Sequence, residues 1–206
     1  MDNSFEEEEN DGGASFRRYK AVDLVIWTII AAVVEAVATL AASKWFPNEI
    51  YCLSTTIAIV SIVMMRWNGF AAIQAALGGA IYSFLIAGGN IEQIVIYSVG
   101  NCFMMLGLIF FKLVGKEKIR SKFMWSLLYA ALMYVLAQVG RWAVSLIFGY
   151  DPGAILARLL TDPITLLFTI MVVLISRVPD GLFEDQKHYI IRTDSERRKA
   201  DGENYL

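Results

Sequence analysis

The sequence has few of the residues that build enzyme active sites and metal centres. It contains one histidine, His188, and two cysteines, Cys52 and Cys102, which are far apart and form no CxxC pair. This spacing predicts neither a disulfide framework nor a metal site. The GxxxxGK[ST] nucleotide loop, the HExxH zinc motif and a suitably placed GxSxG are all absent. We therefore expect a chain that is not an enzyme, carries no cofactor and cannot hydrolyse ATP by itself.

Charge is scarce in the middle of the chain. Charged residues make up 18% of the 206 residues and hydrophobic residues 57%, and the mean hydropathy is +0.52. Most of the charge lies in residues 1–20, in residues 112–122 and from Arg177 onward. An acidic stretch precedes the first basic cluster, which is the reverse of a signal peptide. The basic loops are short, so we expect no nucleic-acid partner and a chain embedded in the lipid bilayer.

Six apolar runs are long enough to cross a bilayer as helices. At 1.5 Å per residue they measure roughly 24 to 39 Å, whereas barrel strands alternate in polarity over about ten residues. The sequence thus predicts an all-α membrane protein, a six-transmembrane-helix bundle. Asp162-Pro163 interrupts the last run, so a miscount would most easily arise there. The runs are residues 22–42, 50–65, 70–87, 91–111, 123–148 and 155–176.

Lysine and arginine favour one side of these spans. Cytoplasmic loops are usually rich in Lys and Arg, and alternate loops here contain many such residues or almost none. The poor set holds only Lys44, so we expect both termini in the cytoplasm (N-in/C-in). The rich set comprises Arg17, Arg18, Lys20, Arg66, Lys112, Lys116, Lys118, Arg120, Lys122 and Arg177.

This topology divides the chain into three parts. We expect a disordered acidic cytoplasmic N-terminus over residues 1–20, a transmembrane domain over residues 21–178 and a polar cytoplasmic tail over residues 179–206. The tail contains an apolar stripe that suits the membrane surface, a partner or the protein's own cytoplasmic face equally well. The stripe consists of Leu182, Phe183, Tyr189, Ile190 and Ile191.

Polar residues inside the spans gather in the predicted outer half. Buried charges in a membrane are costly and often functional, so these residues suggest a substrate-binding cavity that opens outward. Arg141 and Arg158 would offer guanidinium forks to a carboxylate or phosphate. The alternative is structural pairing, of Arg158 with Asp162 and of Glu35 with Arg141. The candidate binding residues are Arg141, Arg158, Glu35, Asn101, Tyr97, Trp142, Tyr82 and Asp162.

Small residues recur four apart in the first span. Ala32 and Ala36 form one pair, and Ala38 and Ala42 form a second. Such spacing lets another helix approach closely. The approaching helix can belong to the same bundle or to a second membrane protein.

Over residues 20–177 the chain resembles the substrate-binding S components of energy-coupling factor (ECF) transporters. The resemblance rests on the six short spans, the alanine motif of the first span and the small-residue segment NGFAAIQAALGGAIY of residues 68–82. It implies a multi-pass protein of the bacterial cytoplasmic membrane that captures a vitamin-like nutrient from the outer face. It also implies a transmembrane coupling subunit and two cytoplasmic ATPases as partners. Ala32 and Ala36, or secondarily Ala38 and Ala42, would then face the coupling subunit.

The two ends of the chain do not follow the pattern shared by S components. The acidic N-terminus and the polar tail leave room for a divergent relative with another role. The alternative function is that of a membrane scaffold or regulatory protein that transports nothing and acts through its cytoplasmic tail.

Overall fold

The computed structural model describes residues 4–45, 53–153, 155 and 162–203, which consist of helices joined by turns and contain no strand. This confirms the all-α fold class. The elements are α1 (Ser4–Trp45), α2 (Thr56–Trp67), the 3₁₀ turn η1 (Asn68–Ala71), α3 (Ala72–Ala87), α4 (Ile91–Cys102), the 3₁₀ turn η2 (Phe103–Leu106), α5 (Gly107–Val114), α6 (Lys116–Ser121), α7 (Phe123–Ile147), α9 (Pro163–Ser176) and α10 (Gln186–Glu203).

Among the described residues, four helical runs are long and apolar enough to cross a membrane: Phe16–Trp45, Thr56–Ala87, Ile91–Val114 and Phe123–Ile147. Their length and composition indicate a membrane protein. A shorter apolar helix, Pro163–Ser176, follows Asp162 and has its proline in the first turn. Proline suits this position because its missing N–H would have no helical partner there. The break that the sequence places at Asp162-Pro163 is therefore the start of α9.

The run from Thr56 to Ala87 reverses direction at Asn68, where φ is 54° and ψ is −128°. A Cβ atom added to Gly78 of α3 would lie 2.2 Å from the hydroxyl of Thr56 at the start of α2. In one straight helix these two residues would be roughly 33 Å apart. Thus α2 and α3 form an antiparallel hairpin. The two helices approach each other this closely because Gly78 has no side chain.

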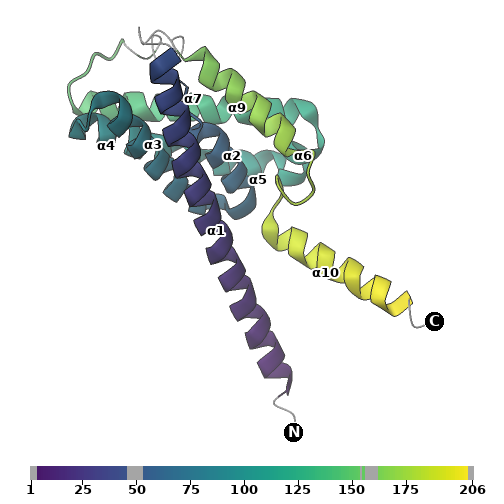
Figure 1. The fold of residues 1–206 in the computed structure, drawn as a ribbon. Coiled ribbons are helices and arrows are strands. Elements are labelled where there is room, and N and C mark those ends of the chain that lie inside the picture. The colour runs from purple at the N-terminus through teal and green to yellow at the C-terminus, as the bar shows by residue number, and fades with distance from the viewer. Residues whose placement is uncertain (1–3, 46–52, 154, 156–161, 204–206) are drawn as a thin grey trace.

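α2 is the central helix of the bundle. Every residue from Thr56 to Trp67 is buried, and α2 contacts α1, α3, α7 and α9. A helix that is apolar on all sides must be enclosed on all sides. The other helices surround it through the neighbouring pairs α3–α4, α4–α7, α1–α3 and α7–α9 (Figure 1).

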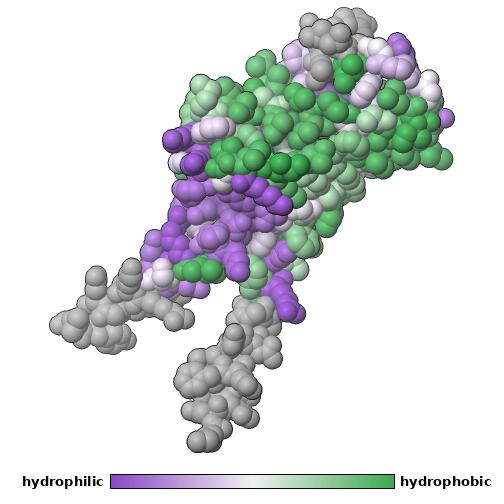
Figure 2. Space-filling view, turned by 180° about the vertical axis from the view of Figure 1, so that it is seen from behind, coloured by the Kyte–Doolittle hydropathy of each residue, from purple (hydrophilic) through white to green (hydrophobic). Residues whose placement is uncertain are grey.

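The face of the bundle seen in Figure 2 carries a broad hydrophobic band. On α1, Val25, Ile29 and Val37 are each more than half exposed, as side chains in contact with lipid would be. α10 and the N-terminal half of α1 project from the same end of the bundle (Figure 1). Hydrophilic residues cover that end (Figure 2), which we call the polar end.

The expected boundaries at residues 20 and 178 are not breaks in the fold. α1 runs through residue 20 without interruption. Beyond α9, Phe183 is fully buried in the main hydrophobic core and its ring centroid is 6.1 Å from that of Tyr129 on α7. The first residues of the tail therefore pack on the protein's own polar end, whereas Ile191 is 59% exposed.

Candidate functional site

Arg141 on α7 lies at the centre of a polar cluster inside the apolar bundle. Its side chain is buried, and its Nε donates a 2.8 Å hydrogen bond to Oδ1 of Asn101 on α4. Its guanidinium carbon lies 4.7 Å from the centroid of the Tyr97 ring, a cation–π contact. Nη2 is buried and has no hydrogen-bond partner among the described residues. The arginine thus has one donor group free for a further acceptor.

Two glycines bring Arg141 to this position. A Cβ atom on Gly140 would lie 2.1 Å from the carbonyl oxygen of Gly100, and one on Gly100 would lie 2.6 Å from Cα of Arg141. The backbones of α4 and α7 therefore touch where these glycines meet, as small residues permit in membrane helices. This contact places Arg141 beside Asn101, the residue that follows Gly100.

Asn101 is fixed by a second hydrogen bond. Its Nδ2 donates to the backbone carbonyl of Ala75 on α3 at 3.2 Å. Tyr82, also on α3, has its ring centroid 5.2 Å from that of Tyr97. The cluster is thus held by α3, α4 and α7 together, and its aromatic rings supply the kind of wall that small-molecule sites use.

Asp162 joins the same cluster from the start of α9. Nε2 of Gln138 on α7 donates a 3.3 Å hydrogen bond to Oδ2 of Asp162, and the Asp162 carboxylate interacts electrostatically with Arg141. The sequence analysis did not single out Gln138. Its position three residues before Arg141, on the same helix face, is the signal that could have found it.

Two other predicted site residues have different partners. Trp142 donates from Nε1 to the carbonyl of Pro152 at 2.9 Å, so it ties α7 to the following turn. Glu35 of α1 accepts three hydrogen bonds at Oε2, from the backbone N–H and hydroxyl of Thr55 and from the N–H of Thr56, at 2.6 to 2.7 Å. Glu35 therefore caps α2 and does not pair with Arg141. Arg158 lies outside the described residues.

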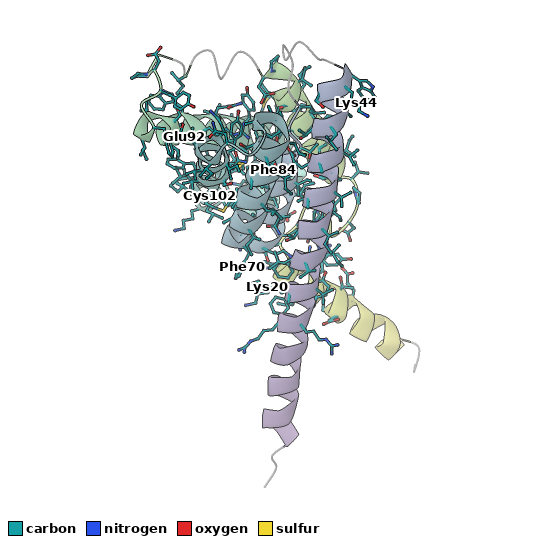
Figure 3. All side chains as sticks on the ribbon, turned by 60° about the vertical axis from the view of Figure 1, so that its left-hand side comes forward. Lys20, Lys44, Phe70, Phe84, Glu92 and Cys102 are labelled. Carbon is teal, nitrogen blue, oxygen red and sulfur yellow. The ribbon has the colours of Figure 1, made fainter. Side chains whose placement is uncertain are left out.

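The predicted partner-facing alanines lie on α1. Ala32 and Ala36 line an apolar groove of about 410 Å³ between α1, α3 and α4. Phe84 of α3 also lines this groove and stands beside α1 in Figure 3. Ala38 and Ala42, also on α1, are half-buried. The groove is thus built by the pair that the sequence analysis favoured.

Ion pairs hold the polar end together. Arg66 of α2 binds Asp23 of α1 at 2.6 Å and donates to the carbonyl oxygens of Gly181 and Leu182 at 2.6 and 3.3 Å. One guanidinium therefore joins two helices to the start of the tail. Because both charged side chains are largely buried, this pair is expected to restrict the geometry of the polar end.

Lys116 makes a comparable link from α6. Its Nζ donates to the carbonyl of Met65 at 2.8 Å and to the carboxylate of Asp185 at 2.6 Å. Burial lowers the pKa of Lys116, and the ion pair with Asp185 opposes that shift. The tail is thus attached to the bundle by Lys116 as well as by Arg66.

Comparison with known proteins identifies no relative: no family model, curated protein or solved structure matches the chain.

Proposed function

We propose that this chain is the substrate-capture subunit of an ECF-type importer, with six spans, both termini in the cytoplasm and a small anionic or amphipathic nutrient bound from the outer face. The observation that carries the proposal is the buried Arg141 guanidinium, whose Nη2 has no hydrogen-bond partner among the described residues. A buried charge in a membrane bundle is costly unless it is compensated. A carboxylate or phosphate would compensate this one.

The surroundings of Arg141 favour a ligand over a purely structural role. Asn101 and Tyr97 are neutral, so their contacts orient the guanidinium without cancelling its charge. Asp162 is the nearby carboxylate, and its Oδ2 accepts a hydrogen bond from Gln138. Among the described residues, no ion pair within 4 Å joins Asp162 to Arg141. An anionic ligand would accept a hydrogen bond from Nη2 of Arg141 and pack against the rings of Tyr82 and Tyr97.

Two features of the fold support the proposed topology. In the proposed topology the hairpin of α2 and α3 would make two passes of the run Thr56–Ala87, and α9 would supply the sixth span. Arg141 lies roughly 27 Å along α7 from Phe123, near the end of α7 that is remote from α6 and the polar end. Because the polar end holds the basic residues, it would be cytoplasmic and Arg141 would lie in the outer half.

The proposed partners are those that the resemblance to ECF S components implies. They are a transmembrane coupling subunit and two cytoplasmic ATPases, which would hydrolyse ATP for a chain that has no nucleotide loop of its own. The groove at Ala32 and Ala36 would bind a helix of the coupling subunit, because it is lined by apolar side chains, three of them alanines.

Native mass spectrometry of protein gently extracted from native membranes tests this function. We expect a small molecule to co-purify with the wild type and with Lys112→Gln, which removes an exposed charge elsewhere, but not with Arg141→Gln. Arg141→Lys should retain part of the binding, since it keeps the charge and loses the fork. A wild type with no bound small molecule, coupling subunit or ATPase would contradict the proposal.

A membrane scaffold that acts through its tail is the second candidate. It is favoured by α10, which projects from the bundle (Figure 1) and exposes residues 193–196. Deleting residues 187–206 keeps Phe183 and Gln186 in place and removes the projecting surface. Loss of function in this deletion, together with full function in Arg141→Gln, would favour the scaffold over the importer subunit.

A further inference from the structure

A pocket lies at the polar end, between α1, the 3₁₀ turn η1 and the start of α10. Its volume is about 480 Å³. It combines three aromatic side chains with basic ones: Phe16, Lys20, Trp67, Phe70, Lys187 and His188. None of these residues belongs to the Arg141 cluster, so the pocket requires its own explanation.

The charges around this pocket do not cancel. Two of its lining residues are already neutralised, Arg66 by Asp23 and Asp185 by Lys116, both at 2.6 Å. Lys20 and Lys187 have no carboxylate within 4 Å in the part of the chain that the structure describes. The pocket therefore carries a net positive charge, supplied by Lys20 and Lys187.

The neighbouring cavity at the same end is different. It is lined by Lys116, Arg120 and Arg192, and all three cations are ion-paired with Asp180, Glu184 or Asp185 at 2.6 to 3.1 Å. Its positive charge is thus already compensated by the protein. An anion would therefore bind more favourably in the pocket that contains Lys20 than in this cavity.

Lys20 is held over aromatic rings. Its Nζ lies 3.3 Å from the centroid of Phe70 and 5.7 Å from that of Trp67, and Figure 3 shows Lys20 and Phe70 together at the edge of the bundle. The side chain is half-buried. A partly desolvated ammonium without a carboxylate partner is a ready site for an anionic group.

The pocket also lies at the depth of lipid headgroups. Lys20 directly precedes the apolar stretch of α1, and Phe70 is 47% exposed beside it. Aromatic and basic side chains at the boundary between the polar end and the hydrophobic band are typical of the membrane interface. Phe70 would face the acyl chains while Lys20 and Lys187 face the headgroup.

We infer that this pocket binds a phosphate group, and that its occupant is the headgroup of an anionic phospholipid of the cytoplasmic leaflet. The chemistry is that of basic pockets at the cytoplasmic ends of membrane helices, which hold anionic lipid headgroups. The inference rests on the proposed orientation, with the polar end in the cytoplasm, and not on the ligand proposed for Arg141.

Lipid titration of the full-length protein in detergent, followed by native mass spectrometry, tests the inference. Phosphatidylglycerol and phosphatidylcholine with identical acyl chains are compared. We expect tighter binding of phosphatidylglycerol, weakened roughly thirtyfold in the double variant Lys20→Gln/Lys187→Gln, with phosphatidylcholine unaffected. Lys187→Gln alone, at an exposed position, should show a smaller loss with the fold intact.

Lys112→Gln/Lys122→Gln is the matched control, because it removes two exposed lysines outside the pocket. It should bind phosphatidylglycerol like the wild type. Equal binding of the two lipids, unchanged binding in the Lys20/Lys187 variant, or an equal loss in the control would each overturn the inference. Displacement of phosphatidylglycerol by millimolar inorganic phosphate would assign the pocket to free phosphate and overturn the lipid assignment.

Discussion

Oε2 of Glu35 accepts both the backbone N–H and the hydroxyl of Thr55, at 2.7 and 2.6 Å, so that a carboxylate of α1 caps the first turn of α2. The first N–H groups of a helix have no intrahelical partner, and a negative charge there is stabilised by the helix dipole. The contact stabilises Oε2 of a fully buried carboxylate that has no ion pair with a cation among the described residues.

Removing this cap should destabilise the bundle. We expect Glu35→Ala to cost roughly 2 kcal/mol, because it leaves buried N–H groups of α2 without an acceptor. Glu35→Gln should cost less, since the amide oxygen still accepts hydrogen bonds. Thermal unfolding of the protein in detergent measures both. Glu92→Gln, at an exposed site in the first turn of α4, is the control, and a loss there as large as that of Glu35→Ala would contradict the capping role.

A side chain at Gly140 should separate α4 from α7. Its Cβ would lie 2.1 Å from a backbone oxygen, which cannot move aside as a flexible side chain can. We expect Gly140→Ala to cost roughly 1–3 kcal/mol and to weaken any ligand binding at Arg141. Gly69→Ala is the control, because its Cβ would meet only Leu108 at an ordinary 3.8 Å. Equal unfolding temperatures for the two variants would show that the close contact is not required.

Phe183 should anchor the tail to the bundle. Truncating this fully buried ring to alanine is expected to cost about 3 kcal/mol and to speed hydrogen exchange in residues 179–186. Ile191→Ala, at a position that is 59% exposed, should change stability by less than about 0.5 kcal/mol. Unchanged exchange in Phe183→Ala would mean that the ion pairs hold the tail without the ring.

The attachment of the tail should weaken in acid. A 2.6 Å hydrogen bond from Arg120 holds the pKa of Asp180 below its ordinary value of 3.8. The folded state therefore binds this proton less readily than the unfolded state does. The stabilisation is complete above the ordinary pKa and is lost as the pH falls through the lower, folded value.

Asp180→Asn removes this pH-dependent contribution. The difference in stability between wild type and variant should therefore be constant near neutral pH and shrink toward zero below pH 3.8. Unfolding midpoints measured between pH 3 and 7 test this. Asp194→Asn on α10 is the control, because Asp194 has no ion pair within the described ranges. A difference that does not vary with pH would contradict the role of Asp180.

The candidate site was partly predictable from sequence. Arg141, Asn101, Tyr97 and Asp162 stand out because polar groups are rare in apolar helices, and the structure brings them together. Gln138 belongs with them, and its position three residues before Arg141 is the sequence signal that marks it. The partner of Glu35 could not be predicted, since Thr55 is 20 residues away and the distance between the two depends on how α1 packs against α2.

The sequence by itself determined the helical class, the lengths of the apolar runs and the polar character of one end, because hydropathy is a property of each segment alone. Tertiary structure decided that α2 lies at the centre, that Glu35 caps it and that Phe183 returns to the core. It also decided that Lys20 lies over the rings of Phe70 and Trp67, whereas Arg66 is neutralised by Asp23. These outcomes depend on distances between helices, and those distances are set where Gly78, Gly100 and Gly140 let backbones touch.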